Sequence, residues 1–166
     1  MLERFYPDKE VLSAYKLDYE KLYLQGYRGI IYDIDNTLVP HGAPADKRAV
    51  RLFRRLQKIG FATTLLSNNK EPRVKSFADQ VNCPYIYKAG KPGTAGYEKA
   101  MEMMGTHKEN TLFVGDQLFT DIWGAKKAGI MTYLVKPIHP REEIQIVLKR
   151  KLESIVLYFY HRKMRR

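Results

Sequence analysis

The sequence contains a single cysteine, Cys83, among 166 residues. One thiol cannot form an internal disulfide, so the fold depends on its core, as is usual in a reducing compartment. No second cysteine or histidine stands at metal-ligand spacing beside Cys83, and the four histidines are scattered along the chain. We therefore expect a cytoplasmic protein in which Cys83 is a small core residue without a chemical role.

Long apolar runs are also lacking. No stretch approaches the roughly 18 apolar residues that a membrane-spanning helix requires. The first residues, 1–7, read MLERFYP and do not show the basic-then-apolar order of a signal peptide. These two absences predict a protein that is neither secreted nor integral to a membrane.

Acidic residues are scarce relative to basic ones. The chain has 18 Asp and Glu against 29 Lys and Arg, a net charge of +11. Such an excess favours polyanionic partners such as nucleic acid, anionic lipid or a strongly anionic substrate. The excess is concentrated in residues 141–166, which hold eight basic and three acidic residues.

Apolar residues make up 45% of the chain, enough for one substantial core, and we expect a single domain over residues 1–166. Short apolar stretches alternate with segments of helical periodicity. The predicted strands are 29–33, 62–66, 85–87, 111–115 and 131–135. The predicted helices are 46–59, 71–81, 94–104 and 119–128. This alternation indicates an α/β fold, a doubly wound, Rossmann-like parallel sheet of about five strands flanked by helices.

Two carboxylates directly follow the first predicted strand, where residues 33–39 read DIDNTLV. Side chains two apart on an extended segment share a face, so Asp33 and Asp35 can point into one pocket. One carboxylate can attack a phosphorus atom while the other transfers a proton, which suits catalysis through an aspartyl phosphate. The alternative is a pair of solvated turn residues, with Thr37 capping a local bend.

Two more polar clusters lie between the second and fourth predicted strands. Ser67 and Asn68 follow residues 62–66, and there a hydroxyl can donate to a phosphate oxygen or simply cap the next helix. Lys91, in the Gly-Lys-Pro stretch 90–92, can offset the negative charge of a nucleophile and a phosphate. Lys88, three residues earlier, competes for the same role.

The fourth predicted strand leads into another acidic cluster. Residues 113–121 read FVGDQLFTD, so Asp116 stands at the strand end and Asp121 follows five residues later. Converging carboxylates repel each other unless a cation joins them, and an all-oxygen site suits Mg²⁺. The sequence therefore predicts a magnesium site.

These four motifs, in this order, resemble those of the haloacid dehalogenase (HAD) superfamily over about residues 28–137. The closest likeness is to subfamily IIIA-type small phosphatases without a cap domain. These carry DxDNTL, SNN, KP and GDQxxTD, and they include mitochondrial phosphatidylglycerophosphate phosphatases. The chain reads DIDNTLV, LSNN, GKP and GDQLFTD, and it departs from that pattern nowhere.

The resemblance implies a Mg²⁺-dependent phosphatase with Asp33 as nucleophile and Asp35 as general acid and base. The metal would be bound by the Asp33 side chain, the Asp35 carbonyl and Asp116, with Asp121 in support. The phosphoryl oxygens would be bound by four residues: Thr37, Ser67, Asn68 and Lys91.

The intervals 39–66 and 68–90 are both filled by predicted core elements, which leaves no room for a cap domain. An open site suits a phosphate carried by something large. We expect the C-terminal segment 138–166 to be a basic amphipathic helix, whose apolar spacing favours packing on the sheet and whose aromatic and basic end suits an anionic membrane surface. The apolar residues at helical spacing are Ile144, Leu148, Leu152, Ile155, Val156 and Phe159.

Our leading hypothesis is therefore a phosphatase that acts on an anionic phospholipid, phosphatidylglycerophosphate, through peripheral contact with the inner face of the membrane. The first alternative is a phosphatase for a soluble nucleotide, sugar phosphate or phosphoprotein. The second is a nucleic-acid-binding protein on a HAD scaffold, which we rank lowest because it would not need these carboxylates and Lys91. The oligomeric state does not follow from the sequence.

Overall fold

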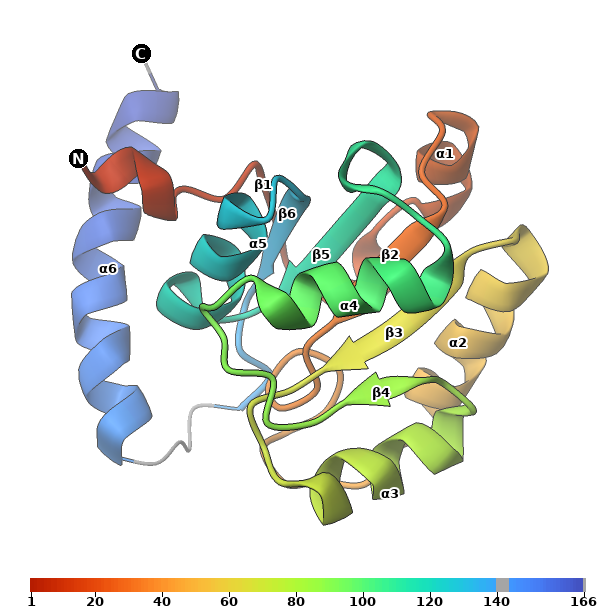
Figure 1. Ribbon diagram of the computed structural model, residues 1–166. Coiled ribbons are helices and arrows are strands. Elements are labelled where there is room, and N and C mark those ends of the chain that lie inside the picture. The colour runs from red at the N-terminus through yellow and green to blue at the C-terminus, as the bar shows by residue number, and fades with distance from the viewer. Residues whose placement is uncertain (140–143, 166) are drawn as a thin grey trace.

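The computed structural model of the protein describes residues 1–139 and 144–165. Its centre is a six-stranded sheet in which every pairing is parallel, in the order β1-β6-β5-β2-β3-β4 (Figure 1). The strands are β1 (Lys9–Val11), β2 (Gly29–Tyr32), β3 (Ala62–Leu66), β4 (Tyr85–Ile86), β5 (Thr111–Gly115) and β6 (Met131–Val135). The α-helices are α1 (Tyr19–Leu24), α2 (Lys47–Ile59), α3 (Glu71–Val81), α4 (Ala95–Met104), α5 (Trp123–Lys127) and α6 (Ile144–Met164). Shorter helical turns are η1 (Leu2–Phe5), η2 (Ala14–Lys16), η3 (Lys108–Asn110) and the π-helical η4 (Leu118–Ile122).

The sheet is covered on both faces because the side chains of its central strands alternate and are apolar on both sides. In β2, Ile30 and Tyr32 join the core beneath α1, α2 and α3, whereas Ile31 joins the opposite core beneath α4 and α5. All three side chains are fully buried. Figure 1 shows α4 in front of the sheet. A strand apolar on both faces is typical of a parallel sheet with helices on each side.

The strand order reverses between β2 and β5. From β2 the chain proceeds outward through β3 to β4, whereas β5 lies on the other side of β2 and leads to β6. Ligands of open parallel sheets bind beyond the carboxyl ends of the strands at such a reversal. The ends of β2 and β5 carry Asp33 and Asp116, so the topology brings the two acidic motifs together.

The expected fold class is confirmed, and all five predicted strands are present within one or two residues of their expected bounds. The sixth, β1, was not predicted, because its three residues Lys9–Val11 show neither an apolar run nor alternation. It lies at the sheet edge, where it pairs with β6. The helix α1 was not predicted either, because six residues are too few to show a helical periodicity.

Asp8 attaches this edge strand to the sheet. Its Oδ2 accepts bonds from the Thr132 amide at 2.9 Å and the Thr132 hydroxyl at 2.8 Å, and Lys126 Nζ lies 3.1 Å from its Oδ1. Burial opposes ionisation, but Thr132 and Lys126 together lower the pKa of Asp8 below 3.8. Asp8 therefore stabilises the fold in its ionised form.

We expect Asp8→Asn to lower the free energy of unfolding by about 1 to 2 kcal/mol at pH 7. Because the folded-state pKa is below the unfolded value of 3.8, the contribution is full above pH 3.8 and is lost as the pH falls through the folded-state pKa. Urea denaturation at pH 7 and pH 3 measures both. The control is Asp79→Asn, which removes an exposed pair with Lys75 and should change stability by less than about 0.5 kcal/mol. An Asp8→Asn protein as stable as the control would contradict this account.

Helix α6 exposes most of the apolar residues that we expected it to bury. Its contact face holds Val156 and Tyr160, both buried, and Glu153, which is 3% exposed. Arg150 is also drawn inward, by Asp116. Four residues of the expected contact stripe are between 43% and 59% exposed: Leu148, Leu152, Ile155 and Phe159. The prediction of their burial was wrong because these charged and aromatic contacts, which periodicity ignores, set the rotation of the helix.

The N-terminal segment packs against the same contact face of α6. Tyr6 and Tyr160 meet edge to face with ring centroids 5.2 Å apart, and Phe5 contacts Phe119 and Trp123, each at 5.1 Å. Figure 1 shows η1 beside the C-terminal half of α6. Of the expected C-terminal segment 138–166, residues 140–143, residue 166 and the side chain of Ile144 lie outside the described part of the chain.

Candidate active site

The end of β2 directs Asp33 and Asp35 into one cavity of 290 Å³. Asn36 adopts a left-handed conformation with φ 59°, and its amide donates to the Val39 carbonyl at 2.7 Å. This turn brings Thr37 back towards the strand end, where its Oγ1 lies 3.4 Å from Asp33 Oδ2 and 3.1 Å from Asp116 Oδ1. The hydroxyl can donate its proton to only one of these carboxylates at a time.

Lys91 provides the positive charge at the centre of the site. Its Nζ lies 2.8 Å from Asp33 Oδ1 and 2.6 Å from Asp121 Oδ1, and the residue is 7% exposed. Burial opposes the charged form, but Asp121 and Asp33 raise the pKa of Lys91, so it stays protonated. The competing candidate Lys88 is exposed, on the loop before Gly90. The structure thus places Lys91, and not Lys88, against the carboxylates.

The segment after β3 fixes two residues of the site through the Asn68 side chain and the Asn69 backbone amide. The Asn68 side chain accepts a bond from the Lys91 amide at 2.8 Å and donates to the Lys91 carbonyl at 3.0 Å. Ser67 is buried, and its Oγ accepts from the Asn69 amide at 3.1 Å. Ser67 lines the cavity, and its hydroxyl can donate a hydrogen bond as well as accept one. The expected phosphate-binding residues Thr37, Ser67, Asn68 and Lys91 all lie at this end of the sheet.

The end of β5 supplies the other carboxylates. Asp121 Oδ2 accepts bonds from the amides of Asp116 at 3.2 Å and Gln117 at 3.1 Å. Gly115 permits this fold of the chain, because a Cβ there would lie 2.6 Å from Asp121 Oδ2. Tyr97 donates to the Asp121 carbonyl at 2.8 Å. Asp121 is thereby fixed by both backbone and side-chain contacts.

Three buried carboxylates converge in this site, with one oxygen each from Asp33, Asp116 and Asp121 within 4.8 Å of one another. Burial and the repulsion from Asp121 raise the pKa of Asp33 to about 6, in spite of Lys91. Burial and the Asp33 charge likewise hold the pKa of Asp116 well above its usual range. An excess of clustered negative charge and an all-oxygen donor set fit a hard divalent cation.

Asp35 has partners of its own. Its Oδ1 accepts bonds from the Gly42 amide at 2.8 Å and from Arg73 Nη2 at 2.9 Å, and Asn69 Nδ2 lies 3.4 Å from its Oδ2. Burial opposes ionisation, but Gly42 and Arg73 outweigh it and hold the pKa of Asp35 below its usual value. In this arrangement Asp35 is ionised at neutral pH, so it must take up a proton before it can act as an acid.

Two arginines that the sequence does not mark as site residues also contact the catalytic carboxylates. Arg73, on α3, pairs with Asp35. Arg150, on α6, donates to the Asp116 carbonyl at 2.6 Å, pairs with the Asp116 carboxylate and lies 3.1 Å from Glu153 Oε2. No motif marks either residue. Arg150 and Glu153 stand three apart on the predicted helix, and this spacing of opposite charges is the one sequence signal for the helix face that contacts the site.

We expect a divalent cation to stabilise this protein. At a Mg²⁺ concentration 100 times its dissociation constant, the free energy of unfolding should rise by about 2.7 kcal/mol relative to protein in EDTA. Calorimetric unfolding with Mg²⁺ and with EDTA measures this. Asp116→Asn should lose the increase, whereas the distant Asp79→Asn should keep it. An equal increase in both variants would place the ion elsewhere.

Comparisons with known proteins agree with this geometry. The HAD-hydrolase-like family matches residues 88–144. A probable phosphatase of Bacillus subtilis, YqeG, is 36% identical over 165 residues, which cover 98% of this chain and 96% of YqeG. Phosphatidylglycerophosphate phosphatase 1 of Arabidopsis thaliana is 27% identical over 95% of this chain, which spans 48% of the plant protein.

Among solved structures, a putative HAD superfamily (subfamily III A) hydrolase of Legionella pneumophila superposes with a TM-score of 0.52. The two are 13% identical, and the match covers 75% of this chain and 71% of that one, so it shows a shared fold. Within residues 33–110, no domain is inserted between the sheet strands beyond α2, α3, α4 and η3, which agrees with a core that lacks a cap there. The chain therefore belongs to the haloacid dehalogenase-like hydrolases, in the family of small phosphatases that includes YqeG.

Proposed function

We propose that this phosphatase hydrolyses a phosphate monoester through an aspartyl phosphate on Asp33 with the help of Mg²⁺. The observation that carries the proposal is the Asp33 carboxylate, buried between the Lys91 ammonium and the hydroxyl of Thr37. The side chains of Asp33 and Asp116 and the carbonyl of Asp35 would hold the ion, with Asp121 in support. The ion would supply positive charge beside the nucleophile and the phosphoryl group.

In the first step an oxygen of Asp33 attacks phosphorus as the ester P–O bond breaks, and Asp35 gives its proton to the leaving alcohol oxygen. In the second step a water attacks the phosphorus of the aspartyl phosphate, Asp35 takes the water's proton, and the Asp33 carboxylate is released. The negative charge of a bound phosphate raises the pKa of Asp35, which favours the protonated acid that the first step needs. Thr37, Ser67 and Lys91 donate to the phosphoryl oxygens.

We further propose phosphatidylglycerophosphate as the substrate. The name of the Arabidopsis relative supports this choice, as does the absence of an inserted cap among the described residues between β2 and β5. Ile146 and Lys149 of α6 line the catalytic cavity, so the basic C-terminal helix lies beside the place where a phosphate would bind. The net charge of +11 favours an anionic surface over a neutral one.

The outward face of α6 is suited to peripheral contact with the cytoplasmic face of the membrane. No helix in the described part of the chain is long and apolar enough to cross a membrane. Arg162, which is exposed, lies on the same side of the helix as the apolar residues of that face. A helix that presents apolar residues and cations together can lie at an anionic interface. The apolar residues of this face are Leu148, Leu152, Ile155 and Phe159.

The test is phosphate release with Mg²⁺ from phosphatidylglycerophosphate in vesicles that contain phosphatidylglycerol, beside a panel of soluble phosphomonoesters. We expect the lipid to be hydrolysed with a kcat/KM at least about 100-fold above that of any soluble ester, the equivalent of roughly 2.8 kcal/mol. Faster turnover of a soluble ester would keep the chemistry and contradict the lipid substrate. Inactivity towards every ester, with tight and salt-dependent binding of RNA or DNA, would favour the nucleic-acid alternative.

A further inference from the structure

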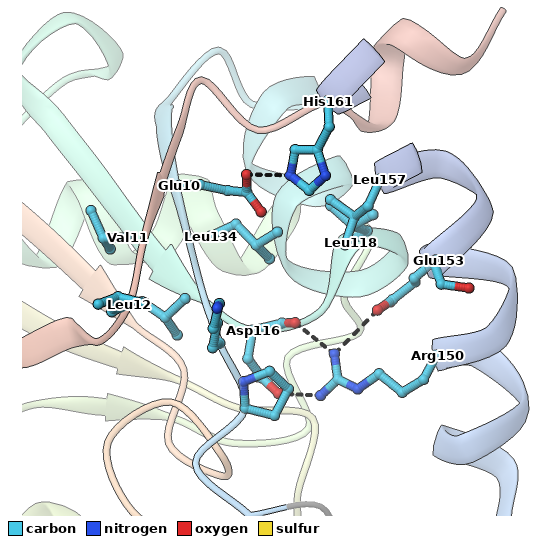
Figure 2. A pocket seen from close by; sticks show the side chains of 14 residues that line it. Glu10, Val11, Leu12, Asp116, Leu118, Leu134, Arg150, Glu153, Leu157 and His161 are labelled. Atoms are coloured by element: carbon cyan, nitrogen blue, oxygen red, sulfur yellow. Dashed lines mark hydrogen bonds and ion pairs between the residues drawn. The ribbon is translucent and has the colours of Figure 1, made fainter. Parts of the chain in front are cut away.

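A second cavity begins where the catalytic site ends. It has a volume of 510 Å³ and runs between the β1–β6 edge of the sheet and the inner face of α6 (Figure 2). Figure 2 shows Val11 and Leu12 on one side and Leu157 on the other, with Leu118 and Leu134 between them. We call this cavity the apolar groove. Its lining is mainly apolar, unlike that of the catalytic cavity.

The groove and the catalytic site share a residue. Asp116 lines the groove, and its Oδ1 lies 3.1 Å from Thr37 Oγ1 in the catalytic site. Arg150, which also lines the groove, pairs with the Asp116 carboxylate at this junction (Figure 2). Lys149, the neighbour of Arg150 on α6, lines the catalytic cavity. A molecule whose phosphate lay near Asp33 could thus extend past Asp116 into the groove.

The lining of the apolar groove combines paired charges at its ends with apolar side chains between them. At one end of the groove Arg150 pairs with Asp116 and Glu153, and at the other His161 pairs with Glu10 (Figure 2). Lys136 and Ser154 also line the groove, and between the two paired ends the side chains are mainly apolar. An apolar groove gains free energy by burying a hydrocarbon chain. A sugar phosphate or a nucleotide would leave the apolar part unused.

We propose that the apolar groove binds an acyl chain of the phospholipid substrate. This inference rests on the proposed function and adds the site at which the lipid part is recognised. Helix α6 then contacts hydrocarbon on two sides, with Leu157 facing the bound chain and the outward residues facing the membrane. Such a helix would present the phosphate to Asp33 without removing the whole lipid from the bilayer.

Ser154 offers the sharpest test, because it lines the groove from α6 and Ser154→Trp would fill that space. The control, Lys151→Trp, adds the same side chain at an exposed position of α6 that does not line the groove. A second variant, Leu12→Glu, places a charge in the groove at a residue that is 66% exposed and therefore tolerant of substitution. Circular dichroism verifies that each variant is folded.

The first readout is kcat/KM for deacylated and for dihexanoyl phosphatidylglycerophosphate, both monomeric in solution. For the wild type and Lys151→Trp we expect the dihexanoyl ester to be preferred at least about tenfold, since each fully buried methylene is worth about a fourfold change. Ser154→Trp and Leu12→Glu should lose this preference while hydrolysing the deacylated ester within about twofold of wild type. An equal preference for the dihexanoyl ester in all four proteins would contradict acyl-chain binding in the groove without contradicting the proposed phosphatase function.

The second readout does not depend on catalysis. Calorimetric binding of dihexanoyl phosphatidylglycerol, below its micelle concentration, should be weakened at least about tenfold by Ser154→Trp and unchanged by Lys151→Trp. Equal affinity in both variants would overturn the inference even if the enzyme proved inactive on this lipid. If the wild-type protein bound dihexanoyl phosphatidylglycerol but hydrolysed none of the esters, the groove would stand and the proposed function would be contradicted.

Discussion

Asp33→Asn is expected to reduce phosphate release by at least about 10⁴-fold while leaving the protein folded. The side-chain amide cannot attack phosphorus, so the step that forms the aspartyl phosphate is lost rather than slowed. Asparagine has nearly the same shape, and its oxygen can still accept from Lys91 Nζ, which lies 2.8 Å from Asp33 Oδ1. It also removes one of the charges that repel each other in this cluster, so the free energy of unfolding without metal should not decrease.

Phosphate release under Mg²⁺ saturation and thermal unfolding in EDTA measure the two halves of this expectation. The matched control is Asp46→Asn, which changes an aspartate at the N-terminus of α2, where its side chain accepts from the Ala49 amide at 2.8 Å. Asparagine is an equally good cap, so this variant should keep wild-type activity and stability. An Asp33→Asn enzyme with more than about a hundredth of wild-type turnover would rule out Asp33 as the nucleophile.

Lys91→Met is expected to lower kcat/KM by about 10²- to 10³-fold and the free energy of unfolding by about 3 kcal/mol. The activity falls because the charge beside the phosphoryl oxygens is removed. The stability falls because Asp33 and Asp121, both buried, lose the cation that lies 2.8 and 2.6 Å from them. Since protonation of the carboxylates can relieve part of this penalty, the loss of stability should be smaller at pH 5 than at pH 8.

The control is Lys88→Met, at the residue that competes with Lys91 in the sequence but is exposed in the structure. It should change activity less than about threefold and stability by less than about 0.5 kcal/mol. Kinetics and urea denaturation of both variants measure the difference. Equal losses in the two variants, or a larger loss at Lys88, would contradict the assignment of the cation.

Much of this site could be predicted from the sequence because its residues stand at the ends of strands. A parallel sheet brings such ends to one edge, so the sequence alone predicts that Asp33, Ser67 and Asp116 meet. The sequence could not distinguish Lys91 from Lys88, because the conformation of the loop that carries both decides which ammonium reaches the carboxylates. Only the fold shows that the Asn68 side chain holds the backbone of Lys91.

The parts that could not be predicted depend on contacts between distant segments. Arg73 approaches Asp35 because α3 follows the turn after β3, and Arg150 reaches Asp116 across 34 residues. Neither arginine differs, in sequence, from the many solvated cations of a basic chain. The rotation of α6 follows from Arg150 and Glu153 being drawn inward, so apolar spacing alone selected the wrong face.

The most direct test of the account is to trap the covalent intermediate. Wild-type and Asp35→Asn enzymes would be mixed with phosphatidylglycerophosphate and Mg²⁺, quenched in acid within milliseconds and reduced with borohydride, which converts an aspartyl phosphate to homoserine. We predict homoserine at position 33, accumulating more in Asp35→Asn because the second step lacks its base. Homoserine at another position, or intact Asp33 in an enzyme that is turning over substrate, would contradict the covalent mechanism.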